Sequence, residues 1–215
     1  MTDRSFSLLP VFGGTFDPVH IGHLRSALEV REALACERVL LVPAGQPPHG
    51  KQPVASPAQR LHMLQIATAG TPALQVDARE IERPGLSYMV DTLHGLREEY
   101  PAAALCLVVG NDAFAGLPAW NRWRELSELA HLVVLRRPGG ERDLADELVT
   151  LLEARRTDDV AALTTRRAGL IIELGVTPLA VASSQLRAAA AAGRGLEWLI
   201  PGPVLEYIDA QGLYR

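Results

Sequence analysis

The sequence predicts an α/β protein with a doubly wound, mostly parallel sheet that helices cover on both faces. Six short runs rich in Val, Leu and Ile alternate with longer segments that have the periodicity of amphipathic helices. The runs are apolar throughout, as expected for strands buried on both faces. In such folds ligands bind beyond the carboxyl ends of the strands, where loops lead into helices.

The first predicted strand contains a proline. The six strands are expected at residues 8–12, 38–43, 74–78, 104–110, 131–137 and 169–174. Pro10 lies inside the first of them, and proline cannot donate to a central ladder. Either its nitrogen faces a gap in the pairing, or the strand begins at Val11.

Two helices have clear sequence signals. Residues 23–35 place Leu and Ala side chains on one face. A second helix is expected over 57–69, because Ser56, Pro57 and Gln59 read as an N-cap, a first-turn proline and a capping-box partner.

Length and composition bound the domain organisation. A chain of 215 residues, 48% of them hydrophobic, is expected to form one domain over 1–215. The segment 138–168 is charged and poorly patterned and is expected to be a surface insertion, and 183–215 a C-terminal helical part.

Charge and cysteine content narrow the class of protein. The formal net charge of −4 argues against a nucleic-acid binder. Cys36 and Cys106 are expected to be buried free thiols in a reducing compartment. No segment approaches the roughly 18 apolar residues of a membrane span, so a cytoplasmic protein without a membrane partner is expected. Self-association into a homo-oligomer remains compatible with these features.

The stretch GGTFDPVHIGH, residues 13–23, follows the first strand and combines features of an anion site. Gly13 and Gly14 allow the backbone to approach a ligand, and Thr15 offers an amide and a hydroxyl. His20 and His23 project from one side of a helix start, where unpaired amides and the dipole also favour an anion. Cap or turn residues are the alternative interpretation, and two histidines alone make a poor zinc site.

The full string resembles the G-x-F-D-P-x-H-x-G-H signature of the nucleotidyltransferase superfamily, whose members join a nucleoside triphosphate to a phosphorylated partner and release pyrophosphate. The resemblance implies a Rossmann-like nucleotidyltransferase fold. It implies that His20 and His23 contact the ATP phosphates and that the turn from Gly13 to Phe16 supports nucleotide binding.

A second phosphate half-site is expected in VASSQLRAAAAAGRGLEWLIP, where Ser183 and Ser184 begin a helix and Arg187 follows. One serine in such a place is usually a cap, whereas two serines and an arginine also suit a phosphate. The stretch resembles the superfamily's I-S-S-T-x-I-R motif, with Ala182 in place of the first serine. The resemblance implies a catalytic Arg187 and ATP contacts from both serines.

The segment GQPPHGKQ, residues 45–52, nearly spells a phosphate-binding Walker A loop. Gln52 replaces the hydroxyl that would hold magnesium, and Pro47 and Pro48 remove two amide donors. The segment instead resembles the P-P-H-basic loop of bacterial nicotinate-nucleotide adenylyltransferases. That resemblance implies phosphate contact by Lys51, one place beyond the family's basic residue.

The same family is resembled by SYMVDTL (87–93) and GNDAFAGLPAWNRWREL (110–126), which match its S-Y-T-x-D-T-L and G-x-D-x-x-x-x-L-x-x-W segments in order and spacing. The resemblance implies that Trp120 stacks on the pyridine ring of the acceptor and that Asp112 lies near the ATP ribose. Without the family, Trp120 is equally well interpreted as ordinary packing.

The acceptor side also includes Tyr88, Met89 and Asn121. Met89 stands where the family commonly has a Thr that helps receive the nicotinate carboxylate, and Met offers no useful hydrogen bond. Backbone amides around Trp120 and Asn121 are then expected to receive the carboxylate. If they do not, the acid and amide mononucleotides are discriminated less well.

The resemblance implies adenylyl transfer from ATP to nicotinate mononucleotide, which gives deamido-NAD and pyrophosphate in NAD biosynthesis. Mg²⁺ is expected to be held mainly by the ATP phosphates and water, with no dedicated protein ligands. Asp17, before Pro18 at a turn, is as readily structural as metal-binding.

Three alternatives remain. A pantetheine-phosphate adenylyltransferase shares the opening motif, but it does not account for SYMVDTL or the Trp120 loop. A non-catalytic nucleotide sensor on the same scaffold is disfavoured because His20, His23 and Arg187 are intact. A Rossmann dehydrogenase is disfavoured because no G-x-G-x-x-G follows the first strand.

Overall fold

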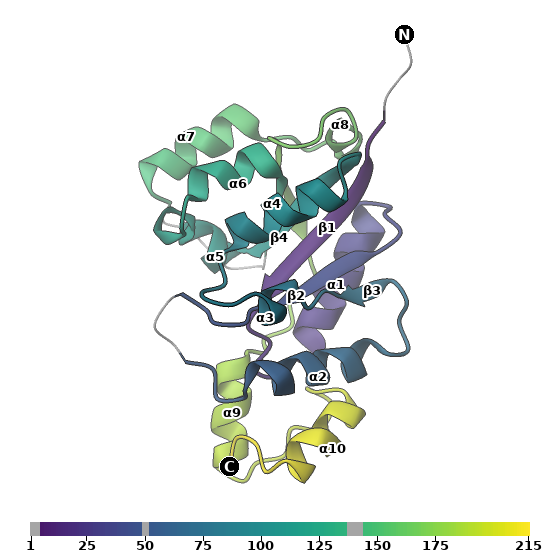
Figure 1. Ribbon diagram of the computed structural model, residues 1–215, viewed down its shortest axis with the longest axis vertical. Coiled ribbons are helices and arrows are strands. Elements are labelled where there is room, and N and C mark those ends of the chain that lie inside the picture. Colours follow the sequence, from purple (N-terminus) through teal and green to yellow (C-terminus); the bar gives the residue numbers. More distant parts are fainter. Residues whose placement is uncertain (1–4, 49–51, 137–143) are drawn as a thin grey trace.

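The central sheet is parallel throughout and doubly wound, as the sequence predicts. The computed structural model describes residues 5–48, 52–136 and 144–215. Within them six strands lie in the order β3-β2-β1-β4-β5-β6 (Figure 1). The strands are β1 (Ser7–Gly14), β2 (Val39–Pro43), β3 (Leu74–Val76), β4 (Ala103–Gly110), β5 (His131–Arg136) and β6 (Ile171–Gly175). All six predicted strands are therefore confirmed, with β3 shorter than expected.

The first strand continues through its proline. β1 pairs with β4 from Ser7 opposite Ala103, whereas its register with β2 starts only at Val11 opposite Leu40. Pro10 thus precedes the ladder with β2. Of the two alternatives for this residue, a strand that begins at Val11 is wrong, and a gap in the pairing on one side is what the register contains.

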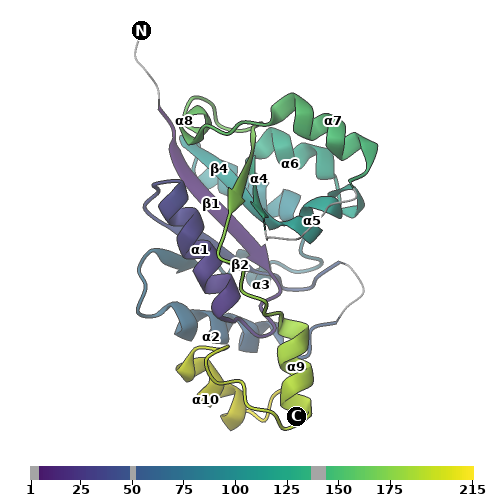
Figure 2. The ribbon, with the colours of Figure 1, turned by 180° about the vertical axis from the view of Figure 1, so that it is seen from behind.

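Helices connect the strands and cover both faces of the sheet (Figures 1 and 2). They are α1 (Ile21–Ala33), α2 (Pro57–Thr68), α3 (Arg79–Glu82), α4 (Met89–Glu99), α5 (Asn111–Ala115), the 3₁₀ helix η1 (Leu117–Ala119), α6 (Trp123–Leu129), α7 (Asp146–Arg155), α8 (Val160–Leu163), α9 (Ser183–Ala191) and α10 (Gly202–Ala210). The predicted capping box begins α2: Ser56 Oγ accepts the Gln59 amide at 3.2 Å, and Gln59 Oε1 accepts the Ser56 amide at 2.9 Å.

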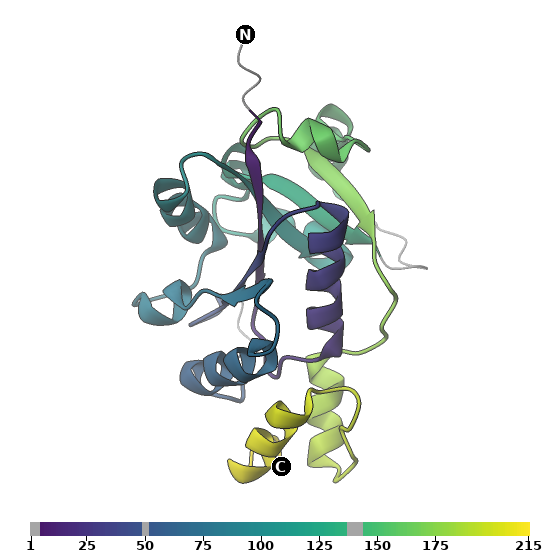
Figure 3. The same cartoon turned by 90° about the vertical axis from the view of Figure 1, so that its right-hand side faces the viewer.

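Each face of the sheet has its own apolar core, because side chains alternate along a strand. On one face, Leu105 and Leu107 of β4 pack with residues of α4, α6 and α7. On the other face, Cys106 and Val108 pack with residues of α1 and α8. A third cluster joins α2, α9 and α10, which gather near the N-terminal end of α1 (Figure 3).

The segment expected as an insertion contains regular structure. Its described part, from residue 144 on, holds α7 and α8, whose Leu148 and Leu163 are fully buried in the cores of opposite faces. The segment thus contributes to both cores, while its status as an insertion, like the single-domain assignment, stays a prediction. The helices α9 and α10 lie within the predicted C-terminal helical part.

Two further expectations concern the cysteines and the membrane. Cys36 and Cys106 are both buried and free, as predicted. Among the residues that the structure describes, no helix has the length and apolar character needed to cross a bilayer.

Candidate active site

A cavity of about 350 Å³ opens at the carboxyl edge of the sheet, between the ends of β1 and β4. This is where the strand order changes direction, which is the usual ligand position in doubly wound folds. Its lining includes eight of the residues predicted from the sequence: Gly13, Gly14, Thr15, His23, Tyr88, Met89, Trp120 and Asn121. The topology therefore brings the opening motif and the predicted acceptor segments to one place.

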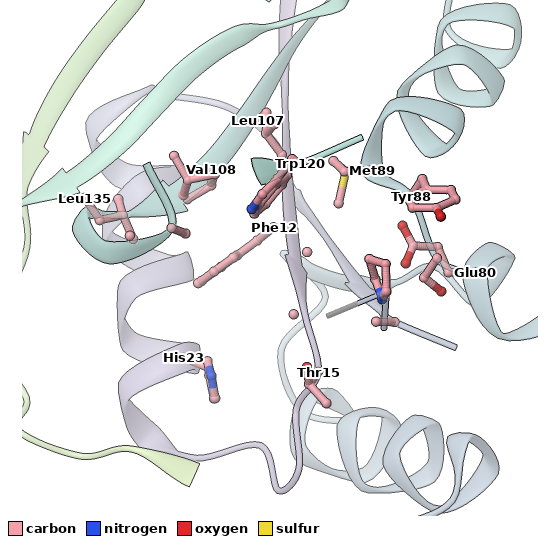
Figure 4. A pocket seen from close by; sticks show the side chains of 18 of the residues that line it. Phe12, Thr15, His23, Glu80, Tyr88, Met89, Leu107, Val108, Trp120 and Leu135 are labelled. Atoms are coloured by element: carbon pink, nitrogen blue, oxygen red, sulfur yellow. The ribbon is translucent and has the colours of Figure 1, made fainter. Parts of the chain in front are cut away.

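The cavity has an apolar half and a polar half (Figure 4). Trp120, Phe12 and Met89 lie together on one side. His23 and Thr15 lie at the other, on the start of α1 and on the turn after β1. The two halves suit a flat aromatic ring and an anionic group, respectively.

The turn after β1 contains a buried aromatic side chain. Phe16 adopts a left-handed backbone conformation, with φ of 50°, and its side chain is 1% exposed. Its ring meets that of His23 edge-on, with centroids 5.0 Å apart. Phe16 therefore shapes the turn, while Thr15 is the exposed residue of the pair.

Both histidines of the motif take part in the cap of α1, and His23 also lines the cavity. His20 is the N-cap residue, and its amide donates to Nδ1 of His23 at 3.3 Å. The rings stack with centroids 3.7 Å apart. The cap interpretation is thus confirmed by these contacts. It is compatible with a ligand role, because a neutral His23 that accepts at Nδ1 carries its proton on Nε2.

The glycine between the histidines is required by close packing. A Cβ atom on Gly22 would lie 2.8 Å from Cγ1 of Val181 and 3.0 Å from the His20 ring. His20 itself is 3% exposed and lies behind His23, which lines the cavity. A side chain at position 22 would therefore force Val181 to shift and would crowd the His20 ring.

The predicted second half-site docks on the opening motif. Ser183 Oγ donates to the carbonyl of Pro18 at 2.9 Å, and Arg187 Nη1 donates to the carbonyl of Asp17 at 2.7 Å. Ser184 is exposed on the same first turn of α9. Ser183 thus binds another segment instead of capping its own helix, and α9 places Arg187 beside the motif.

Asp17 has a structural set of partners. Its carboxylate accepts the amides of Val54 at 2.8 Å and Ala55 at 3.1 Å, and the hydroxyl of Tyr214 at 2.7 Å. Arg187 Nη1 lies 3.7 Å from Oδ2. The Asp17 side chain is 2% exposed, and these donors already satisfy its carboxylate oxygens. Of the two interpretations, the structural role therefore agrees with the contacts of Asp17.

A buried arginine, which sequence reasoning missed, holds the loops below the cavity. Arg60 of α2 has no exposed surface and donates to four main-chain carbonyls. These are Thr15 at 2.8 Å, Ala44 at 2.5 Å, Gly45 at 2.8 Å and Ala55 at 3.2 Å. Burial lowers the pKa of its guanidinium from the ordinary value. Arg60 is the only arginine or lysine within the helical run 57–68, which is the one signal the sequence contained.

The start of the segment that imitates a Walker A loop is committed to other contacts. The amides of Gly45 and Gln46 both donate to Ser87 Oγ, at 2.8 and 3.2 Å. A Cβ atom on Gly45 would lie 2.2 Å from the carbonyl oxygen of Glu80. These amides bind a side chain and do not form a phosphate cradle. Lys51 lies outside the described residues.

On the acceptor side, Met89 is the first residue of α4 and reaches the end of β1. A Cβ atom on Gly13 would lie 2.3 Å from Met89 Cε. Trp120 follows η1 as its C-cap residue, and its neighbour Asn121 is exposed. Asp112 is exposed in the first turn of α5, next to lining residues of the cavity.

A buried carboxyl group on the cavity wall was also missed. Glu80 is 4% exposed, and its Oε1 accepts the hydroxyl of Thr92 at 2.5 Å. Burial raises the pKa of Glu80 above its usual value, against the opposing effect of that hydrogen bond. Glu80 and Thr92 thus tie α3 to α4 beside Tyr88.

A family model described as cytidylyltransferase-like matches residues 11–177. The Plasmodium falciparum nicotinic acid mononucleotide adenylyltransferase complexed with NaAD has a TM-score of 0.74 at 13% identity, over 97% of both chains. Its complex with APC gives a TM-score of 0.72 over the same shares. The chain is therefore a nucleotidyltransferase of the cytidylyltransferase-like class.

Closer relatives narrow this class. A Methylococcus capsulatus protein described as a probable nicotinate-nucleotide adenylyltransferase is 48% identical over 208 residues, which are 96% of this chain and 99% of that protein. A Pseudomonas aeruginosa protein of the same description is 47% identical over 206 residues, covering 95% and 96%. The chain belongs to the nicotinate-nucleotide adenylyltransferase family.

Proposed function

We propose that the protein transfers the adenylyl group of ATP to nicotinate mononucleotide, giving deamido-NAD and pyrophosphate as a step of NAD biosynthesis. The observation that carries the proposal is one cavity that joins Trp120 and Met89 to the turn and helix start bearing Thr15 and His23. A pyridine ring suits the aromatic half, and phosphates suit the helix start. The family to which the chain belongs supports the same substrates.

The chemistry needs alignment more than a protein nucleophile. An oxygen of the mononucleotide phosphate attacks the α-phosphorus of ATP, and the bond from that phosphorus to the bridging oxygen of the β-phosphate breaks. A phosphate monoester has a second pKa of about 6, so the attacking group is largely a dianion at neutral pH. His20, His23 and Arg187 then hold the phosphates in line and offset the charge that develops on the leaving pyrophosphate.

Mg²⁺ is proposed to arrive on the triphosphate. Within the described residues no group of three or more His, Cys, Asp or Glu side chains could hold a metal ion, and the Asp17 carboxylate already has three donors. A magnesium ion that the ATP oxygens and water coordinate needs no such group of protein ligands. When bound there, the ion would neutralise charge on the phosphates.

The remaining roles are assigned by position. We place the triphosphate over the turn from Gly13 to Phe16 and against Ser183 and Ser184, and the ATP ribose near Asp112. Lys51 is proposed as a further phosphate contact. Tyr88 and Asn121 complete the wall around the acceptor. We place the reaction in the cytoplasm, which two buried free thiols support, and a homo-oligomer is compatible with it.

Turnover assays separate the candidate acceptors. Purified protein with ATP and Mg²⁺ is given nicotinate mononucleotide, nicotinamide mononucleotide or phosphopantetheine, and the adenylylated product and pyrophosphate are followed. We expect product with the nicotinate compound at the highest kcat/KM. A higher kcat/KM with phosphopantetheine would contradict the acceptor assignment. ATP binding without any product would favour the nucleotide sensor.

A further inference from the structure

A tyrosine far from the motif in sequence reaches into its centre. Tyr214 lies in the segment after α10, with a left-handed φ of 65° and a side chain that is 6% exposed. Its hydroxyl donates to Asp17 Oδ1 at 2.7 Å, across 197 positions of sequence. Its ring belongs to the apolar cluster that contains Phe16 and Leu186, so packing fixes the direction in which the hydroxyl points.

Asp17 connects Tyr214 to the loop before α2 and to Arg187. Its two carboxylate oxygens accept the amides of Val54 and Ala55, which belong to the loop before α2. Its own carbonyl accepts Nη1 of Arg187, and the same nitrogen lies 3.7 Å from Oδ2. The carboxylate therefore sits between the phenol of Tyr214 on one side and the guanidinium of Arg187 on the other.

The Tyr214 hydroxyl is one of the donors that compensate the buried Asp17 carboxylate. A buried carboxylate is costly unless donors satisfy its oxygens, and a charged hydrogen bond of this kind is among the stronger ones. Burial and the bond to Asp17 raise the pKa of Tyr214, so the hydroxyl stays protonated and remains a donor. Without this hydroxyl, the negative charge of the Asp17 carboxylate would be compensated mainly by the Arg187 guanidinium.

We infer that Tyr214 is a positioning residue for the nucleotide half of the site, because its hydroxyl holds the Asp17 carboxylate and thereby leaves the Arg187 guanidinium to face phosphate. The inference rests on the proposed function, in which Arg187 grips the triphosphate. It makes the segment after α10 part of the ATP site without contact to the ligand.

The test compares Tyr214→Phe with Tyr207→Phe. The two changes remove the same atom from the same part of the chain, but Tyr207 of α10 packs against the His62 ring, 4.6 Å between centroids. The Asp17 carboxylate takes its hydrogen bonds from Val54, Ala55 and Tyr214 instead. Binding of ATP with Mg²⁺ is measured by titration calorimetry on the full chain. KM for ATP, KM for nicotinate mononucleotide and kcat are then measured separately.

In Tyr214→Phe we expect Kd and KM for ATP to rise about three- to tenfold, which corresponds to the net contribution of one typical hydrogen bond. KM for nicotinate mononucleotide should stay within about twofold, as should every constant in Tyr207→Phe. Lost stability cannot imitate this result. An irreversibly unfolded fraction lowers the calorimetric stoichiometry and the apparent kcat without changing Kd or KM. A reversibly unfolding variant raises both KM values together, so neither case raises the ATP constants alone.

Two outcomes would overturn the inference: an ATP affinity of Tyr214→Phe within twofold of the wild type, or equal increases in the two KM values. Wild-type protein that binds ATP but makes no product would refute the proposed function alone, since the effect of Tyr214 on ATP binding would still be measured. A wild type that does not bind ATP would refute both.

Discussion

The imidazole of His23 accepts the main-chain N–H of His20 at Nδ1, 3.3 Å away, while the two rings stack at 3.7 Å. One side chain therefore both caps α1 and faces the cavity. An amide donor fixed on Nδ1 selects the tautomer of the neutral ring, and the stack fixes its orientation. Substitutions at His23 consequently have a structural effect and a functional effect, and the two can be separated.

His23→Asn and His23→Ala form a matched pair for this purpose. The Oδ1 atom of Asn can take the place of Nδ1 as acceptor for the His20 amide, but Asn lacks the Nε2–H donor. We expect kcat/KM to fall by about 100-fold or more in both variants. The free energy of unfolding should fall by about 1 kcal/mol in the Ala variant only. Near-normal activity of the Asn variant would restrict His23 to capping.

Trp120 is expected to carry acceptor binding through its ring. Trp120→Ala should raise KM for nicotinate mononucleotide by about tenfold, within the roughly 1–3 kcal/mol that stacking on an aromatic side chain contributes, and leave KM for ATP near its wild-type value. Trp120→Phe should retain most of the affinity. Trp198, which is 91% exposed, supplies the control, and its change to Ala should alter neither constant. Equal effects at positions 120 and 198 would exclude stacking.

Met89→Thr should sharpen the choice between acid and amide. The hydroxyl would stand at the first position of α4, on the cavity wall, and could donate to the nicotinate carboxylate. We expect the ratio of kcat/KM for nicotinate over nicotinamide mononucleotide to rise about tenfold. Met89→Leu keeps the apolar bulk and should leave the ratio within twofold. An unchanged ratio in the Thr variant would mean that main-chain amides already set the preference.

The sheet could be predicted because its strands leave a local signal. A strand buried on both faces is apolar at every position, as in 104–110 for β4, and the capping residues of α2 are adjacent in sequence. The motif at 13–23 is likewise one continuous string, so its place at the carboxyl end of β1 followed directly, although Gly13 and Gly14 are the last residues of the strand. Even there, local signals set the limits only approximately, since α1 begins at Ile21 and not at residue 23.

The two side chains that hold the turn after β1 from outside the motif, Arg60 and Tyr214, had no such local signal in the sequence. Arg60 reaches the carbonyl of Thr15 across 45 positions, and Tyr214 reaches Asp17 across 197. An arginine in an amphipathic helix is ordinarily a solvent-exposed residue, and a tyrosine near a chain end ordinarily has no assigned partner. Their contacts depend on how α2 and the segment after α10 pack. Only the tertiary structure, therefore, shows that they hold the turn.

A buried histidine outside the cavity should make the free energy of unfolding depend on pH. His131 begins β5 with no exposed surface; its Nδ1 accepts the Leu170 amide at 3.0 Å, and Nε2 lies 3.1 Å from the carbonyl oxygen of Leu163. Burial lowers its pKa from the ordinary 6.5, against the opposing effect of the backbone hydrogen bonds. The folded protein therefore keeps this ring neutral in a range where the unfolded chain binds a proton.

The unfolded state thus binds more protons below about pH 6.5, so the free energy of unfolding should fall as the pH is lowered from there to the depressed pKa of the folded state. Urea unfolding of the wild type and of His131→Gln from pH 5 to 8 measures this contribution. We expect the difference between the two curves to be constant above about pH 7 and to shrink below 6.5, because Gln cannot take up the proton that stabilises the unfolded state of the wild type. A difference independent of pH would mean that His131 titrates alike in both states.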